Sequence, residues 1–350
     1  MQANAVSPID HEAFPRVVEP VSFSFRKEML TCLGQTLSSN SLKLSLWFTL
    51  WYFLTVVHNI STKKLLVDLP LPAFVGTLNL FLGIPLFLPI IANKLDKFEN
   101  SVNVEAFSML GLVHAMGHIS TCLSLNAGSV SFTHVVKSAE PIFASIFSAI
   151  LLKQVFPTYV YYTLIPIILG VSLASTDSSI FSLVGFLTAM ASNVCYQLRS
   201  VLAKVQMTAS SNSKTLNATS TQLSPANIFR LVTISAAFIS LPFMLLIEGP
   251  QIVPVWNVAL KSGVSLSSLL SNICISSWSF YLYNEVAFWV LGVVNPITHS
   301  IGNCLKRVVV IALSSVILRT RHSWLSIAGC ILAVLGTLAY SIATNRARAL

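Results

Sequence analysis

Turn-forming and charged residues divide the chain into about ten apolar stretches of roughly 17 to 27 residues, the length that a helix needs to cross a bilayer core of about 30 Å. We predict these stretches at 43–60, 72–92, 104–122, 128–152, 158–175, 180–205, 227–247, 265–291, 295–317 and 325–343. Because 54% of the 350 residues are hydrophobic and only 9% are charged, the chain could not cover one soluble core with a polar surface. The sequence therefore predicts an all-α integral membrane protein with ten transmembrane helices.

Polar segments mark the limits of the membrane domain. We expect a polar N-terminal tail over 1–42, the ten-helix domain over 43–343 and a C-terminal tail over 344–350. A Ser-, Thr- and Asn-rich stretch over 208–227 is typical of a linker. Residues 1–42 are too polar for a signal peptide and contain acidic residues, so they also differ from an ordinary transit peptide.

Two pairs of similar motifs lie five predicted helices apart. The run that starts at Asn59 (NISTKK) matches the one at Asn193 (NVCYQLR), and the run at Ser131 (SFTHVVK) matches the one at Pro296 (PITHSIGNCLKR). When a unit with an odd number of helices is repeated, the second copy crosses the membrane upside down. The spacing therefore predicts two inverted five-helix repeats, with a binding site near the middle of the membrane, as in secondary transporters.

Permanent charges within the apolar stretches indicate the kind of ligand. An Arg or Lys at the centre of a spanning helix costs roughly 2.5 to 3.5 kcal/mol, so such residues face a cavity or a partner. The expected interior cations are Lys137, Arg199, Lys306 and Arg307. Only two carboxylates, Glu140 and Glu285, lie at similar depth, and we expect Arg230 to reach the membrane surface. The surplus of about two positive charges matches a phosphate ester, which carries about −1.5 to −2.

Polar residues at helical spacing favour a cavity and argue against a metal site. His114, His118 and Thr121 lie on one face of the third predicted helix. The two histidines have the HxxxH spacing of a zinc pair, but no Glu lies between them and no third ligand is evident. Tyr283, within a span, is either an interfacial anchor or a cavity hydroxyl. We expect no metal and no cofactor, and since the basic residues lie in or beside apolar stretches, no nucleic-acid partner.

Several runs of the sequence resemble those of a known family. The runs LWYFLTVVHNISTKK, HAMGHIS, VSFTHVVKSAEP, IEGP, FYLYNE and NPITHSIGNCLKRVVVI are similar to those of the plastid phosphate translocators, within the drug/metabolite transporter superfamily. The resemblance covers about residues 44–343. It implies a fold of ten helices in two inverted repeats and the exchange of phosphorylated compounds for inorganic phosphate.

The resemblance also implies roles for individual residues. It assigns phosphate binding to Lys137, Lys306 and Arg307, and contacts with the rest of the substrate to His118, Thr121, Arg199 and Tyr283. His118 differs from the phosphoenolpyruvate-selective branch, which tends to have Asn at this position. The run VVKSAEPIF is closer to the pentose- and hexose-phosphate branches, and Glu285 stands where a Gln is expected.

We therefore expect an antiporter that exchanges inorganic phosphate for phosphorylated three-carbon compounds across a plastid membrane, with membrane lipid around it. Triose phosphate and 3-phosphoglycerate are the first candidates, followed by phosphoenolpyruvate. The alternatives are a pentose- or hexose-phosphate antiporter, a nucleotide-sugar transporter, and a proton-coupled symporter that uses Glu140 or Glu285. A membrane enzyme acting on phosphorylated lipid is a further alternative, but the chain lacks the paired carboxylates, nucleophile elbow or metal cluster for that chemistry.

Overall fold

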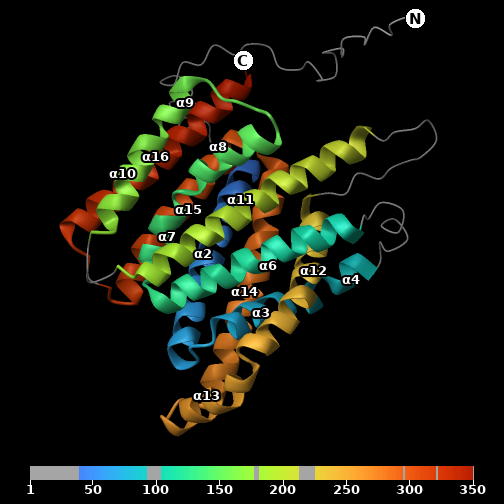
Figure 1. Ribbon diagram of the computed structural model, residues 1–350, viewed down its shortest axis with the longest axis vertical. Helices are drawn as coiled ribbons and strands as arrows, with labels where there is room; N and C mark the ends of the chain where they lie inside the picture. The colour runs from blue at the N-terminus through green and yellow to red at the C-terminus, as the bar shows by residue number, and fades with distance from the viewer. Residues whose placement is uncertain are drawn as a thin grey trace, which may run out of the picture. The chain divides into compact units, whose positions relative to one another are not determined.

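The fold is helical throughout the part of the chain that the computed structural model describes, residues 39–92, 104–176, 181–212, 225–294, 296–320 and 322–349. The helices are α2 (Ser39–Asp68), α3 (Pro72–Phe81), α4 (Ile84–Ala92), α6 (Val104–Ala127), α7 (Val130–Lys137), α8 (Glu140–Leu151), α9 (Thr158–Tyr162), α10 (Leu164–Ala174), α11 (Leu183–Asn212), α12 (Pro225–Ile247), α13 (Gly249–Lys261), α14 (Leu266–Val293), α15 (Pro296–Ile317) and α16 (Trp324–Ala349) (Figure 1). Leu44–Leu350 is one compact unit, and the contacts below lie within it.

Six helical segments are long and apolar enough to cross a membrane. They are Pro72–Pro89, Phe107–Ala127, Val130–Leu151, Ala226–Ile247, Thr298–Ile317 and Trp324–Ala347. The other predicted spans are also helical, but α9 and α10 together form a shorter apolar segment, Thr158–Ala174. Helices α2 and α14 are less apolar because they bury polar side chains such as His58, Asn59 and Ser276 inside the bundle.

The predicted polar segments overlap helices at their edges. The first described helix begins at Ser39, while residues 1–38 lie outside the described part of the chain. Within the predicted linker, α11 continues to Asn212 and α12 begins at Pro225, and 213–224 again lie outside the described residues. The connection between the predicted spans 227–247 and 265–291 forms a further helix, α13.

Helix α13 follows a glutamate that links two parts of the bundle. The Glu248 carboxylate accepts hydrogen bonds from the backbone N–H groups of Ala73 (3.0 Å) and Phe74 (2.7 Å). These groups belong to the first turn of α3, whose N–H groups have no partner within the helix, and a carboxylate also stabilises the positive end of the helix dipole. Glu248 therefore fixes the start of α3 to the end of α12.

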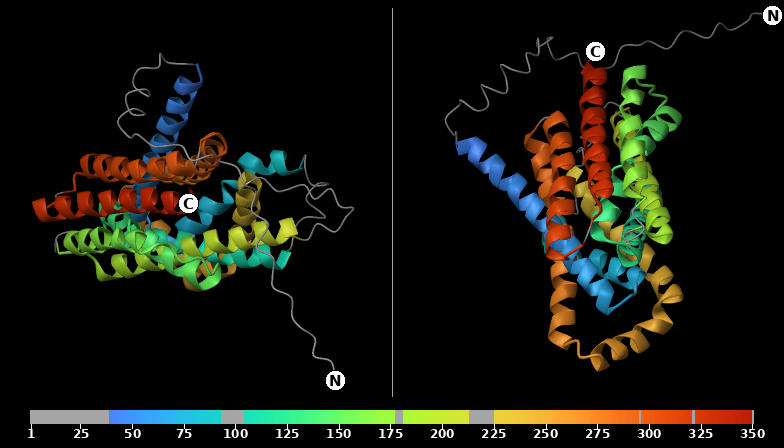
Figure 2. Two further views of the ribbon diagram at one scale, coloured as in Figure 1. Left: turned by 90° about the horizontal axis from the view of Figure 1, so that it is seen from above. Right: turned by 90° about the vertical axis from the view of Figure 1, so that its left-hand side faces the viewer.

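Helices α10 and α16 pack with their backbones in contact, side by side in both views (Figures 1 and 2). A Cβ atom on Gly170 would lie 2.3 Å from the backbone nitrogen of Ala333, and one on Gly329 would lie 2.5 Å from that of Ala174. Small residues permit this close approach, which maximises van der Waals contact between helices in lipid. Glycine at both positions is therefore a requirement of the packing.

Candidate binding site

A cavity of about 240 Å³ lies inside the bundle and is lined by α2, α6, α7, α8, α11, α14 and α15. Its lining includes every residue that the sequence predicts to contact phosphate or substrate: His118, Thr121, Lys137, Arg199, Tyr283, Lys306 and Arg307. The volume is below the 300–1,000 Å³ that is usual for drug-sized ligands. The cavity is thus sized for a small molecule.

A break between α7 and α8 places two opposite charges at the centre of the site. Pro141 lacks the N–H that would donate to the carbonyl of Lys137, and its ring would clash with that carbonyl in a continuous helix. Lys137 therefore ends α7, and Glu140 begins α8. A cation at a helix C-terminus and an anion at an N-terminus are both favoured by the helix dipole.

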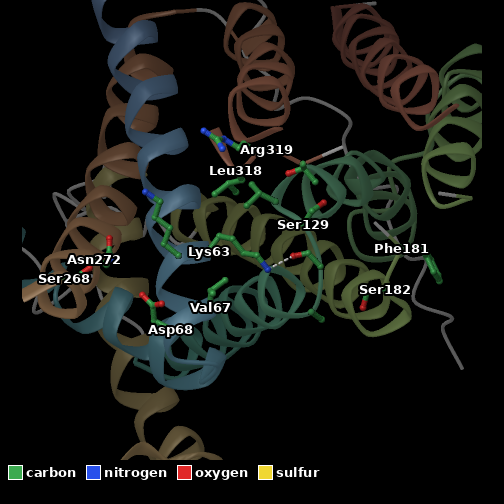
Figure 3. Close-up of a pocket in the computed structure, with 15 residues that line it drawn as sticks. Lys63, Val67, Asp68, Ser129, Phe181, Ser182, Ser268, Asn272, Leu318 and Arg319 are labelled. Atoms are coloured by element: carbon green, nitrogen blue, oxygen red, sulfur yellow. Dashed lines mark hydrogen bonds between the residues drawn. The ribbon is translucent and has the colours of Figure 1, made fainter. Parts of the chain in front are cut away.

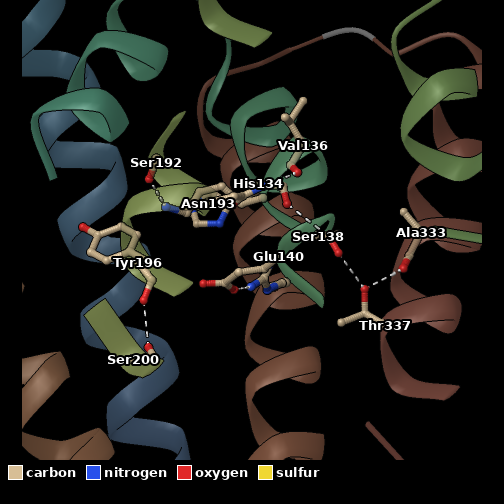
Figure 4. Close-up of polar contacts among 12 residues, drawn as sticks. His134, Val136, Ser138, Glu140, Ser192, Asn193, Tyr196, Ser200, Ala333 and Thr337 are labelled. Atoms are coloured by element: carbon tan, nitrogen blue, oxygen red, sulfur yellow. Dashed lines mark hydrogen bonds and ion pairs between the residues drawn. The ribbon is translucent and has the colours of Figure 1, made fainter. Parts of the chain in front are cut away.

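Neighbouring helices hold the break in place (Figure 4). Asn193 on α11 donates from Nδ2 to the carbonyl of Val136 (3.0 Å). Thr337 on α16 donates from Oγ1 to the carbonyl of Ser138 (3.1 Å). The carbonyl of Val136 also accepts from the backbone N–H of Ala139 (3.0 Å), so Asn193 adds a second bond there. Side chains from α11 and α16 thus support the irregular backbone of the break, as discontinuous membrane helices require.

Lys137 is held by hydroxyl groups and an aromatic ring. Its Nζ donates to Thr121 Oγ1 (3.1 Å) and Ser192 Oγ (2.9 Å) and lies 4.5 Å from the centroid of the Tyr196 ring. These partners orient the ammonium without neutralising it. Its positive charge remains available to a ligand.

The pair Lys306 and Arg307 on α15 lines the same cavity. Arg307 forms an ion pair with Glu140. Lys306 places its Nζ 4.8 Å from the ring centroid of Trp51 and 5.9 Å from that of Tyr283. The two aromatic rings orient the Lys306 ammonium without neutralising it.

Arg199 provides a fourth cation. Its Nη1 donates to His114 Nδ1 (2.8 Å), and its guanidinium carbon lies 5.1 Å from the centroid of the Tyr196 ring. An arginine has only donors, so Nδ1 of His114 must be the acceptor and its ring is neutral. His114 therefore orients Arg199 and leaves its charge uncompensated.

The described lining of the cavity contains these four cations and a single carboxylate, Glu140. The formal excess is three positive charges, one more than the sequence predicts, because Glu285 lies elsewhere. Within the described residues, no group of three His, Cys, Asp or Glu side chains could hold a metal ion.

Glu285 forms a separate buried ion pair with Arg230. Its carboxylate also accepts from Tyr281 Oη (3.0 Å) and Trp289 Nε1 (3.2 Å), and Arg230 donates to Asn227 Oδ1 (2.7 Å). The expectation that Arg230 reaches the membrane surface is therefore wrong, since its side chain is 7% exposed. Glu285 balances Arg230, so it is not available to balance the cavity cations.

Sequence reasoning did not find a neutral polar cluster beside His118. His58 Nδ1 donates to the carbonyl of Ser276 (3.0 Å), and its ring centroid lies 6.2 Å from that of His118. Asn79 Oδ1 accepts from the hydroxyls of Ser276 (2.9 Å) and Ser277 (3.1 Å). The helical spacing of Thr55, His58, Asn59 and Thr62 on α2 was the signal that could have revealed part of it.

Residues 42–341 match the model of the Triose-phosphate Transporter family. The chain is 34% identical over 305 residues to the chloroplastic phosphoenolpyruvate/phosphate translocator 1 of Oryza sativa subsp. japonica, covering 87% of this chain and 72% of the relative. It is 33% identical over 298 residues to the chloroplastic triose phosphate/phosphate translocator of Spinacia oleracea (85% and 70% covered). It is also 33% identical over 310 residues to the chloroplastic xylulose 5-phosphate/phosphate translocator of Arabidopsis thaliana (88% and 72% covered).

Proposed function

The chain belongs to the Triose-phosphate Transporter family, and on this premise we propose that it exchanges inorganic phosphate for phosphorylated organic anions across a plastid membrane. Its relatives are each named for the transport of phosphate together with one organic phosphate, and this organic phosphate differs between them. One observation carries the proposal: Lys137, Arg199, Lys306 and Arg307 surround one small cavity with a formal excess of three positive charges. A phosphate ester supplies about −1.5 to −2 of the missing charge.

Within this class we propose that the organic substrates are three-carbon phosphates, namely triose phosphate and 3-phosphoglycerate. The cavity of about 240 Å³ favours a small ligand over a hexose phosphate. Lys137, Lys306 and Arg307 bind the phosphate group in this proposal. His118, Thr121, Arg199 and Tyr283 contact the remainder of the ligand, where Arg199 suits a carboxylate because its guanidinium can bind both oxygens.

We also propose that the fold is ten membrane helices in two inverted five-helix repeats. Helices α8 and α15 correspond in this scheme, and both end in the same unusual way. Lys153 after α8 and Arg319 after α15 each adopt the left-handed conformation with φ of 53°. This conformation is uncommon for a residue with a Cβ atom. A shared departure at matching positions supports a common structural origin for the two helices.

Counter-exchange by purified protein in lipid vesicles tests the function. Vesicles preloaded with phosphate are offered labelled dihydroxyacetone phosphate, 3-phosphoglycerate, phosphoenolpyruvate, xylulose 5-phosphate or glucose 6-phosphate. We expect uptake of the three-carbon compounds in one-for-one exchange, and little uptake into vesicles that contain only gluconate. Equal rates into both kinds of vesicle would contradict exchange. Uptake driven by a pH gradient alone would indicate a symporter, and consumption of the substrate would indicate an enzyme.

A further inference from the structure

A second cavity, of about 860 Å³, lies at the opposite end of the same helices, and we call it the vestibule (Figure 3). The residues that define it here are Lys63, Lys64, Asp68, Ser129, Asn272 and Arg319. It includes three basic side chains and one acidic side chain among these six, so its polar lining is suited to anions.

The binding cavity and the vestibule succeed one another along four segments that line both. Along α2 the order is His58, then Thr62, then Lys64; along α6 and the turn after it, Thr121, Ser124 and Gly128; along α14, Tyr283, Ser276 and Asn272; and along α15 and the residues after it, Arg307, Val310 and Arg319. In each series the first residue lines the binding cavity and the last lines the vestibule. The two cavities are therefore successive parts of one path through the bundle.

The middle residues of the four series are buried between the two cavities, and we call them the closed layer. Thr62, Ser124, Ser276 and Val310 are all 0% exposed. Thr62 Oγ1 lies 2.7 Å from Ser276 Oγ, which joins α2 to α14 by a hydrogen bond. At the other end of the binding cavity, by contrast, the lining residue Ser200 is exposed. The layer thus separates the binding cavity from the vestibule in this state.

Lys63 supplies the strongest link at the vestibule edge of the layer. Its Nζ donates to the carbonyls of Leu125 (2.7 Å) and Gly128 (2.8 Å), at the C-terminal end of α6 and in the turn to α7. Carbonyls at a helix C-terminus carry partial negative charge, and hydrogen bonds from a charged donor are stronger than neutral ones. Moving α2 away from the α6–α7 turn requires both bonds to break.

We propose that the vestibule is the second entrance of the substrate path and that Lys63 is the latch that holds it shut. The proposal rests on the transport function proposed above. When α2 and the α6–α7 turn separate, the ammonium loses both carbonyl acceptors and faces the vestibule. The loss of these two bonds opposes opening, so removing the ammonium favours the state that is open to the vestibule.

Three variants test the latch. Lys63→Met removes the ammonium and keeps a long unbranched side chain, and Lys63→Arg restores a charged donor. Lys64→Met is the matched control, because Lys64 is the next residue and is exposed to solvent. Vesicles are given one orientation by capture on a C-terminal tag. Since α16 starts beside the vestibule end of α15 and extends away from it, captured vesicles expose the face opposite the vestibule (Figure 1).

The first measurement is the KM for phosphate on each face. Removing the latch raises the fraction of protein that is open to the vestibule. The apparent affinity for phosphate on each face rises with the fraction of protein open to that face. We expect Lys63→Met to lower the KM on the vestibule face and raise it on the other face, by about tenfold in total. Lys63→Arg should reverse most of this change, and Lys64→Met should not produce it. KM values that stay constant, or that move together on both faces, would overturn the latch.

The second measurement does not depend on transport. A cysteine at position 276, introduced as Ser276→Cys, is exposed to a small water-soluble thiol reagent without substrate, and labelling of the parent protein is subtracted. We expect about tenfold faster labelling with Lys63→Met than with Lys63, following the shift in population. Equal labelling rates would contradict the latch. If the wild-type protein exchanged no phosphate, the proposed function would fail, while this rate would still decide whether Lys63 keeps the layer closed.

Discussion

The ion pair between Glu140 and Arg307 makes a quantitative prediction about phosphate affinity. Glu140 is the single carboxylate in the described lining of the binding cavity, and it occupies one of the cations proposed to bind phosphate. A substrate must therefore compete with Glu140 for Arg307. Glu140→Gln keeps the size of the side chain and one carbonyl acceptor but removes its negative charge. We expect this variant to bind phosphate more tightly than the wild type.

The size of the effect follows from the bonds exchanged. A hydrogen bond to a charged group contributes about 1.5 to 3 kcal/mol, which corresponds to roughly 10- to 150-fold in affinity. Because the glutamine oxygen still accepts one bond from Arg307, we expect the lower end, about a tenfold decrease in Kd. Slower release of the anion should lower the rate of phosphate self-exchange at saturation, since tighter binding among related complexes acts mostly on dissociation.

Titration calorimetry in nanodiscs measures the Kd, and vesicle uptake measures the exchange rate. Glu105→Gln is the control, because Glu105 is an exposed carboxylate in the first turn of α6. It should change neither quantity. If Glu140→Gln leaves the Kd for phosphate unchanged or raises it, phosphate does not compete with Glu140 for Arg307. Glu140 would then act by holding Arg307 in its binding position.

The site and the fold make further predictions. Lys137→Ala or Arg307→Ala should abolish vesicle uptake of every substrate, phosphate included, because each removes a charge-assisted bond worth about 1.5 to 3 kcal/mol; wild-type phosphate exchange in Lys137→Ala would contradict its assignment. His118→Asn should change preference among the organic phosphates, toward phosphoenolpyruvate, more than it changes phosphate self-exchange; a parallel loss of both would make His118 structural. Gly170→Val should sharply lower the yield of monodisperse protein and its thermal midpoint, because even its Cβ would lie 2.3 Å from the backbone nitrogen of Ala333; wild-type stability would exclude this close packing.

The sequence predicted the charged part of the site because charge inside a membrane has few acceptable positions. Lys137, Arg199, Lys306 and Arg307 stand in apolar stretches, where a cation must face a cavity or a partner. The structure brings all four to the lining of one cavity. Permanent charge within an apolar helix was therefore a strong signal, and it required no knowledge of how the helices pack.

Pairing and neutral polar contacts could not be predicted in this way. Glu140 and Glu285 both lie at membrane depth, and only the packing of α12 against α14 decides that Glu285 meets Arg230. His58 and Asn79 are neutral, and such residues occur in membrane helices for several structural reasons.

The course of the backbone after α12 was also ambiguous in the sequence. Gly249 and Pro250 are frequent in turns, but proline is equally favoured in the first turn of a helix. The structure uses Pro250 in the second way, at the start of α13. Local residue preferences fit both forms, and the α3 contacts made by Glu248 are long-range information that the sequence pattern does not contain.

The two gates of the proposed path differ in what they must enclose. The closed layer at the vestibule consists of neutral side chains such as Thr62, Ser276 and Val310, so it excludes water without isolating a charge. Closing the other end as well would seal a binding cavity with a formal excess of three positive charges. Desolvating an unpaired ion costs several kcal/mol, so the empty closed state is strongly disfavoured. In the proposed mechanism, a bound phosphate ester would supply most of the missing charge and bridge Lys137 on α7 to Lys306 and Arg307 on α15. The cations proposed to bind the substrate would thereby restrict movement to the loaded carrier, which would give the proposed one-for-one exchange its physical basis.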